Sequence, residues 1–398
     1  MPVATQLDAA PVPAPGSGTI RAFATLWALV VLSRTFLHTV VPLQAYALLG
    51  DAQGVSLLYF FASLIGVAGS LTIPWLVRQL SRRHVFTLAA AGMIAAPGFL
   101  ASDALPLFAS GLVLQVVSVA TVDITLNLYV MDHLPRRQFA HYEPMRAFYS
   151  AAAFTVGPLA GVWLAREIAG WVPFALGAAT ASSLLVTFWL LRWSEHPAVR
   201  PMRRRPPNPL VYLPRFFRQP RLRLAYLLAS ARSGWWALFT IYAPIYAVQS
   251  GFDSVVAGAV VSAGLGWLFL ARLWGIVARV YGVRRLLISA YAAGGLATAS
   301  VAIFGGTAWL GLALLLLAAL VLSALEGVGN VYFLRAVRPL ERTEMTTVFT
   351  TYRDAGQTVP PGICAALLRA FELPVVFLFG GAGLLCVAWY ARHIPRRL

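Results

Sequence analysis

Long apolar runs, separated by short polar connections, constrain this sequence more than any other feature. The run GLALLLLAALVL at residues 311–322 contains no charged residue, and similar runs recur along the chain. A helix that crosses a bilayer needs about 20 consecutive apolar residues. We predict twelve such spans, near residues 22–48, 55–77, 85–101, 106–131, 147–165, 171–191, 224–248, 255–278, 286–304, 308–334, 347–368 and 373–391.

The composition supports a membrane protein built from helices. Of the 398 residues, 59% are hydrophobic and 11% are charged, whereas soluble domains carry about 25% charged residues. Strands of a membrane β-barrel would alternate apolar and polar residues over segments of about ten residues, and these runs do not alternate. The predicted fold class is therefore an all-α membrane protein of twelve helices.

The positive charges gather on one side of the predicted spans. The net charge is +17, and every basic residue apart from histidine is an arginine. The loops on the other side contain only Arg166 and Arg369 among the arginines. This asymmetry follows the positive-inside rule and predicts a multi-pass protein of a bacterial inner membrane with both termini cytoplasmic. It explains the basic charge without nucleic acid, and it predicts contact with anionic lipid at the cytoplasmic face.

The chain reads as two related halves on either side of a linker rich in proline and arginine, residues 194–222. Three segments recur 201 to 203 positions later: 74–86 and 275–287, Asp123-x-x-x-Asn127-x-Tyr129 and Glu326-x-x-x-Asn330-x-Tyr332, and 155–158 and 358–361. We predict a disordered cytoplasmic tail at 1–20, six-helix bundles at 21–193 and 223–392, and a cytoplasmic tail at 393–398. A parallel repeat of two six-helix halves is typical of facilitator-type transporters.

The loop after span 2 and its repeat resemble the signature loop G-x-L-A-D-R-x-G-R-R of the major facilitator superfamily. The second copy keeps Gly275 and Gly282, whereas the first has Pro74 and Ser81 at these places. The resemblance implies two halves related by a pseudo-twofold axis and secondary transport of a small solute by alternating access, without a cofactor. It assigns gating to the loop residues Arg78, Arg82, Arg83, Arg279, Arg284 and Arg285. Arg78 and Arg279 stand where the family has an aspartate that takes part in gating.

Span 5 contains GPLAG, residues 157–161, which resembles the core of the antiporter motif of drug and proton exporters. Gly157 and Pro158 match that motif, but Ala153 and Val162 stand where it has glycine. The alternative is helix packing through small residues together with a proline kink. The motif favours export. Span 4 contains Gln115 but lacks the arginine that many drug antiporters carry upstream of it.

Polar residues inside the spans are the candidate functional site. An ionisable residue at the centre of a span costs about 2.5–3.5 kcal/mol, so its default interpretation is functional. In the family that the sequence resembles, spans 1, 4, 7 and 10 line the central cavity. The cavity candidates are Arg34, His38, Gln115, Asn127, Arg232, Trp236, Tyr242 and Asn330.

Asp123 and Glu326 are the candidates for proton coupling, because a desolvated carboxylate can load and release a proton. The alternative is that each pairs permanently with Arg34 or Arg232 and holds the halves together. The two arginines are equally suited to clamp an anionic substrate.

Three further polar residues, His38, Arg353 and Asp354, are weaker candidates for a functional role. His38 is either a proton relay or a hydrogen-bonded part of the cavity wall. Near the cytoplasmic end of span 11, Asp354 is a candidate gate or salt-bridge residue, and Arg353 is expected to extend its charge toward the interface.

Several other functions lack the residues they need. Without lysine there is no Walker-type nucleotide loop, no histidine and cysteine spacing predicts a metal site, and no catalytic set is visible. The two cysteines are expected to be free thiols. We predict a monomeric, proton-coupled exporter of a small organic compound that is not an enzyme. The alternatives are a proton symporter that imports an organic anion and a membrane scaffold or sensor that transports nothing.

Overall fold

The structure is a computed structural model of the chain, and it describes residues 17–134, 138–191, 209–304, 306–328, 330–338 and 341–395. Residues 1–16 of the predicted tail and most of the predicted linker lie outside this part. The side chain of Arg78 also lies outside it. Within these ranges the regular elements are helices. The fold is thus all-α, as predicted.

The first half of the chain forms seven helices. Their bounds are α1 (Ser17–Thr35), α2 (Val40–Leu49), α3 (Ala52–Gln79), α4 (Arg82–Leu100), α5 (Leu105–His133), α6 (Phe139–Glu167) and α7 (Val172–Leu190). Span 1 corresponds to α1 and α2 together, and spans 2 to 6 correspond to α3 to α7. The helix α1 begins within the segment that we assigned to the N-terminal tail.

The second half follows a short helix of the predicted linker, α8 (Pro209–Phe217). Its elements are α9 (Pro220–Gln249), α10 (Ser254–Gly266), η2 (Trp267–Leu270), α11 (Ala271–Tyr281), α12 (Val283–Phe304), α13 (Ala308–Val328), α14 (Val331–Ala336), α15 (Arg342–Phe349), α16 (Tyr352–Leu367), α17 (Pro374–Tyr390) and η4 (Ala391–His393). Spans 8, 10 and 11 are therefore each divided into shorter helices.

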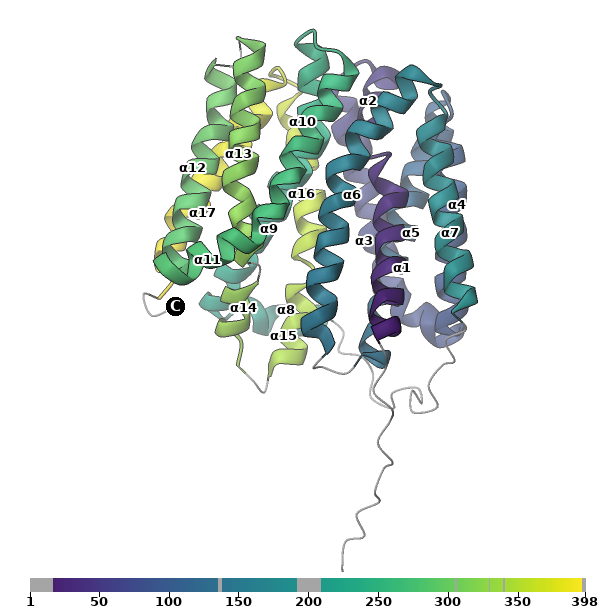
Figure 1. Ribbon diagram of the computed structural model, residues 1–398. Helices are drawn as coiled ribbons and strands as arrows, with labels where there is room; N and C mark the ends of the chain where they lie inside the picture. The colour runs from purple at the N-terminus through teal and green to yellow at the C-terminus, as the bar shows by residue number, and fades with distance from the viewer. Residues whose placement is uncertain are drawn as a thin grey trace, which may run out of the picture.

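Ten of the described helical segments are long and apolar enough to cross a membrane. The other two predicted spans deviate for visible reasons. In span 7, α9 includes Arg221, Arg223 and Arg232 together with polar aromatic residues, and span 11 is divided between the short helices α15 and α16. Both still lie in the bundle beside full-length helices (Figure 1). All twelve predicted spans thus correspond to helices.

Span 1 is broken next to its two candidate site residues. The backbone forms turns over residues 36–39, where Leu37 N donates to Arg34 O at 3.1 Å and His38 N to Thr35 O at 3.2 Å. Pro42 lies four residues after His38 and has no N–H to donate to its carbonyl. The break therefore places Arg34 at the end of α1 and His38 in the turn.

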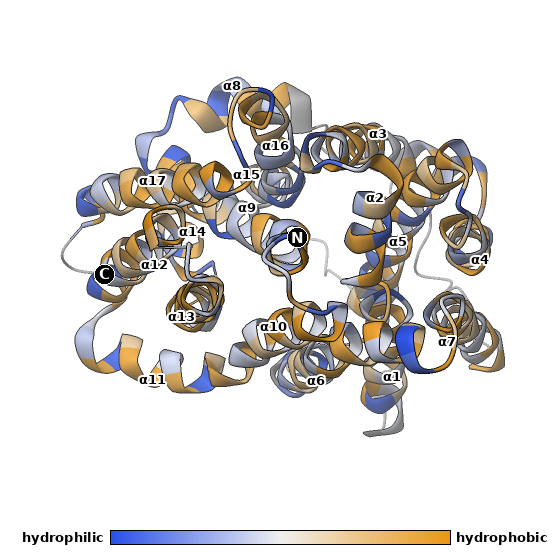
Figure 2. Cartoon of the chain, turned by 90° about the horizontal axis from the view of Figure 1, so that it is seen from above, coloured by the Kyte–Doolittle hydropathy of each residue, from blue (hydrophilic) through white to orange (hydrophobic). Residues whose placement is uncertain are grey.

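The two halves lie side by side, and α1 begins at the same end of the bundle at which α17 ends (Figure 1). We call this the arginine-rich end, because Arg82, Arg215 and Arg285 lie there. Seen along the bundle in Figure 2, α3 packs against α16 and α6 against α10. These two seams join the halves.

Side-chain contacts tie the seams together toward the opposite end. The hydroxyls of Ser56 and Tyr242 hydrogen-bond at 2.8 Å, and Gln249 donates to Tyr46 at 3.0 Å. Arg166 forms an ion pair with Asp253. At the arginine-rich end the described ion pairs stay within one half, such as Arg82 with Asp132, or attach the linker helix α8 to the second half, such as Arg215 with Glu341. The halves are therefore fastened at the end away from the arginines.

Candidate transport site

Each half contains one ion pair between its first and its fourth span. In the first half, Arg34 of α1 lies 3.8 Å from Asp123 of α5, measured from Nη1 to Oδ2. In the second half, Arg232 of α9 lies 3.1 Å from Glu326 of α13, measured from Nε to Oε1. The structure thus brings four of the predicted site residues together in pairs. Each pair lies within one half, so neither pair joins the halves.

The second-half pair is held by a complete hydrogen-bond network. The Arg232 side chain is 8% exposed. Its guanidinium donates to Leu325 O at 3.1 Å, to Asn330 Oδ1 at 3.1 Å and to the Tyr352 hydroxyl at 3.3 Å. Asn330 lies at the break between α13 and α14, which turns its amide toward the arginine. A guanidinium with this many partners is fixed in place and has few donors left for a substrate.

The first-half pair is loose. Arg34 Nε and Asp123 Oδ1 are buried and have no hydrogen-bond partner among the described residues. The Arg34 guanidinium lies over the ring of Phe154, with 5.6 Å to the centroid, and the His38 ring packs on the same phenyl ring at 5.6 Å. The unpaired carboxylate oxygen of Asp123 leaves a position for a proton or a substrate group.

Arg353 is a charged residue near both acids that was not among the predicted cavity residues. It lies on α16 with its side chain exposed, and its charge acts on both Asp123 and Glu326. Its Nε donates to the Tyr352 hydroxyl at 3.3 Å, so Tyr352 links it to Arg232. We expected span 11 to begin at residue 347, but α15 begins at Arg342. The additional turn moves Arg353 about 7 Å further from the end of the span, at 1.5 Å per residue.

The other polar candidates have different surroundings. Gln115 Oε1 is buried without a hydrogen-bond partner within the described ranges, and Asn127 is half-buried on the same helix, α5. Trp236 is half-buried and packs edge-on against Trp235, with 5.0 Å between ring centroids. Tyr242, which we expected in the cavity wall, is fully buried in the seam through its bond to Ser56. Its position fits a gate between the halves.

The residues of the loop motif contact their own half. Arg82 pairs with Asp132 at the end of α5, and Arg83 lies over the Trp189 ring at 4.2 Å. Arg284 donates to the carbonyl of Arg392 at 2.8 Å. Arg279 and Arg285 are exposed. Asp132 is a partner that the motif comparison missed, because it comes from another helix and not from the loop itself.

The GPLAG segment lies where α6 meets the break in span 1. A methyl group on Gly157 would lie 2.4 Å from Thr35 Cβ, and one on Gly161 would lie 1.9 Å from Phe36 O. Both glycines are thus required by close backbone approach, which supports the packing interpretation of this segment. After Pro158, Leu159 N donates to Ser262 Oγ of α10 at 2.8 Å, which ties the same segment to the other half.

Asp354, the last candidate, is half-buried on α16 beside Arg353, whose charge acts on it. Within the described residues, no group of histidine, cysteine and acidic side chains has the geometry to hold a metal ion. Cys364 is buried and Cys386 is exposed, and both are free thiols.

The helices thus form two halves, each with one charged pair between its first and fourth spans. The sequence profile described as Major Facilitator Superfamily matches residues 23–361. The chain belongs to the major facilitator superfamily.

Solved structures of transporters share the fold. The nucleoside transporter NupG has a TM-score of 0.75 at 14% identity, and the alignment covers 94% of this chain and 98% of that one. The peptide transporter POT in complex with sulfate has a TM-score of 0.75 at 13% identity, covering 100% and 99%. A POT family transporter in complex with 5-aminolevulinic acid has a TM-score of 0.75 at 11% identity, covering 94% and 95%. Comparison with proteins of curated function gives no match.

Proposed function

We propose that this transporter moves a small organic solute out of the cell and that Asp123 carries the coupling proton. The protein would act as a monomer in a bacterial inner membrane, with the arginine-rich end and both termini in the cytoplasm. The observation that carries the proposal is the contrast between the two ion pairs. An acid that exchanges protons needs a carboxylate whose partners can be given up, and Asp123 has one distant partner, at 3.8 Å.

The loose pair is placed to respond to the movement of the halves. Arg34 ends α1 at the break of span 1, and α6 packs on this break through Gly157 and Gly161. The same α6 contacts α10 of the other half. A change at the seam would therefore be transmitted to the Arg34–Asp123 distance. Export is the proposed direction because the GPLAG segment resembles the antiporter motif.

The test compares Asp123→Asn with Glu326→Gln, which is a matched change in the other half. Cells that express wild type or either variant would be profiled, with their medium, by mass spectrometry. We expect a compound that wild type depletes from cells and enriches in the medium, and loss of this effect in Asp123→Asn. Equal export by wild type and Asp123→Asn would refute the role of Asp123. Accumulation inside wild-type cells would refute export.

A second candidate function is proton-coupled import of an organic anion, and the position of Arg353 favours it. This exposed arginine faces both acids, and Arg34 has a buried Nε without an acceptor. The two side chains come from opposite halves and could grip one carboxylate or phosphate between them. In this version Arg353 replaces Arg232 in the predicted clamp, because four of the five N–H donors of Arg232 already have acceptors.

The import hypothesis predicts which arginine variants lose accumulation of the anion. Arg353→Gln and Arg34→Gln would each abolish accumulation of the anion, whereas Arg218→Gln, an exposed arginine outside the spans, would leave it unchanged. Uptake that survives the loss of both Arg34 and Arg353 would exclude an anion clamp.

A further inference from the structure

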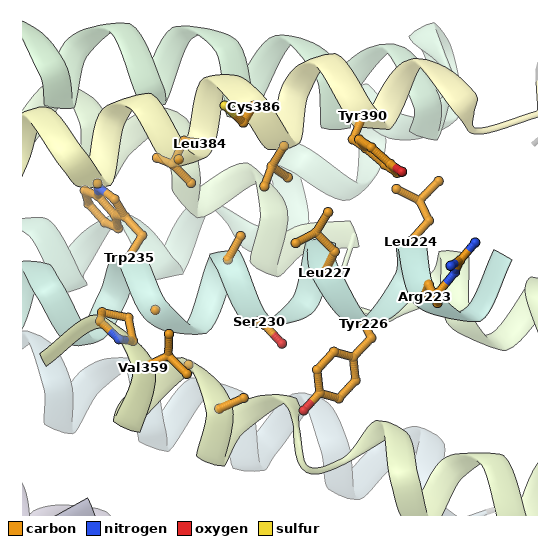
Figure 3. A pocket seen from close by; sticks show the side chains of 18 of the residues that line it. Arg223, Leu224, Tyr226, Leu227, Ser230, Trp235, Val359, Leu384, Cys386 and Tyr390 are labelled. Carbon is orange, nitrogen blue, oxygen red and sulfur yellow. The ribbon is translucent and has the colours of Figure 1, made fainter. Parts of the chain in front are cut away.

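A large apolar groove lies in the second half, away from the two ion pairs. It runs between α9, α16 and α17 and has a volume of about 860 Å³ (Figure 3). Its walls include Leu227 and Trp235 of α9, Val359 of α16, and Leu384 of α17. This volume lies within the range of about 300–1,000 Å³ that is typical of small-molecule sites.

The groove exists because α9 and α17 diverge toward the arginine-rich end. Away from that end the helices touch: the rings of Tyr246 and Phe377 are 5.5 Å apart, and a methyl group on Gly380 would lie 2.7 Å from Leu238. One turn further along α17, a methyl group on Gly383 would have no neighbour within 4 Å. Gly383 therefore faces open space inside the groove.

The charged groups of the groove lie at its mouth, and the hydroxyl and thiol groups of Tyr226, Ser230, Tyr332 and Cys386 lie along its walls. Arg221 and Arg223, both exposed, lie at the mouth with His393 and Tyr390. In Figure 3, Arg223 and Tyr390 lie at the same end and Trp235 at the other. Arg223 forms no hydrogen bond or ion pair with the described residues. The Ser230 hydroxyl is buried and has no hydrogen-bond partner within the described ranges, and it points away from the axis of α9.

The occupant must be apolar along its length and negatively charged at one end. From Arg223 to Trp235 the helix rises about 18 Å, at 1.5 Å per residue. This is close to the depth of one leaflet, which is half of a hydrocarbon core about 30 Å thick. The wall beyond the mouth is apolar, and the two arginines lie at the level where lipid phosphates would be found if the arginine-rich end faces the cytoplasm.

We propose that the groove is a binding site for one anionic phospholipid of the leaflet at the arginine-rich end. One acyl chain fills the space beside Gly383, and the phosphate lies at the mouth, within reach of Arg223. Tyr390 and Ser230 are the further hydrogen-bond donors along its path. The site lies within one half and does not depend on the direction of transport or on the coupling proton.

Native mass spectrometry of the purified full-length protein tests this site. The protein would be titrated with phosphatidylglycerol or with phosphatidylcholine of the same acyl chains. Gly383→Leu fills the groove and is expected to lower retention of phosphatidylglycerol about tenfold or more. Its control is Gly98→Leu in α4, where a side chain also meets open space. Arg223→Gln is expected to weaken retention about fivefold, whereas Arg21→Gln, at the start of α1, changes it little.

The outcomes separate the parts of the proposal. Unchanged lipid retention in Gly383→Leu would overturn the groove as the site. Equal retention of both lipids, with no effect of Arg223→Gln, would overturn the recognition of an anionic head group. A dimer that Gly383→Leu dissociates would show that a second copy of the chain fills the groove and not a lipid. Because Arg223 is exposed, its variant gives a folded protein even if Gly383→Leu does not.

Discussion

Each half contains one ion pair between an arginine and an acid, but the hydrogen-bond surroundings of the two pairs differ. Arg232 and Glu326 are 3.1 Å apart in a network in which each nitrogen of the arginine has an acceptor, whereas Arg34 and Asp123 are 3.8 Å apart with a buried atom unpaired on each side. The repeat in the sequence predicts equal roles. From this difference in surroundings we propose a structural role for the second-half pair and a role in transport for the first-half pair.

The difference can be traced to single positions of the repeat. Tyr352, which binds Arg232, corresponds to Tyr149 in the first half at an offset of 203, yet Tyr352 is buried and Tyr149 is 38% exposed. The break in the first half lies beside the arginine, at residues 36–39, whereas α9 is continuous through Arg232. The acids Asp123 and Glu326 keep the repeat offset of 203, but Arg34 and Arg232 are 198 positions apart, so the repeat preserves the acid and not the place of its partner.

The largest expected effect on stability comes from Arg232→Met. Removing the arginine leaves Leu325 O, Asn330 and the Tyr352 hydroxyl without its hydrogen bonds and Glu326, which is 35% exposed, without its ion-pair partner, which should cost about 2–3 kcal/mol. Thermal unfolding of the purified protein would show a large fall in midpoint. Arg34→Met is the matched change and should cost about 1 kcal/mol or less, because its pair is long and about a quarter exposed. Equal losses of stability in the two variants would contradict the difference between the fixed and the loose ion pair.

The next effect concerns the partner of the fixed arginine. Tyr352→Phe removes the hydroxyl that accepts from Arg232 and Arg353, which should cost about 1–2 kcal/mol in stability. Tyr149→Phe changes the corresponding exposed residue and should cost nothing measurable. Denaturant unfolding of the two variants side by side checks this. A larger effect at Tyr149 would show that the first half contains an unrecognised contact.

The third prediction concerns Pro42 and its counterpart Pro244, at an offset of 202. Pro42→Ala supplies the missing N–H and favours a continuous helix through residues 36–39. It should lower transport several-fold, because Arg34 would then turn away from Asp123, whereas Pro244→Ala should have little effect. Transport that is unchanged in Pro42→Ala would mean that the break does not set the geometry of the pair.

The smallest expected effect lies outside the spans, on the linker helix α8. Hydrogen bonds from Gln219 and Arg215 to Glu341 hold the pKa of this carboxyl below its ordinary value. The folded state then favours the ionised acid, so its contribution is present above the ordinary pKa and is lost as the pH falls through the lowered one. Hydrogen-exchange protection of α8, corrected for the intrinsic exchange rate at each pH, should fall modestly at acidic pH, and Glu341→Gln should remove that pH dependence.

The sequence predicted the helices well and the site in part. All twelve spans lie on helices, and Arg34, Asp123, Arg232 and Glu326 were chosen because charge inside a span is costly. Their pairing within each half could not be predicted, because side-chain reach depends on where a helix breaks. Arg353 was misplaced by one turn at the start of α15, and Tyr242 was assigned to the cavity because a buried seam and a cavity wall have the same residue types. The groove beside Gly383 depends on the divergence of two helices, for which the sequence has no signal.

The central claim is that protonation of Asp123, and not of Glu326, shifts the equilibrium between the conformations of the transporter. Spin labels on exposed residues of the two halves, Met131→Cys and Val280→Cys in a Cys386→Ser background, would report their distance by pulsed electron paramagnetic resonance. The protein would be compared between about pH 5 and about pH 9, the range in which buried carboxylates titrate. We predict a pH-dependent shift in the distance distribution that Glu326→Gln retains and Asp123→Asn abolishes. A shift that persists in Asp123→Asn and disappears in Glu326→Gln would contradict the account and move the proton to the second half.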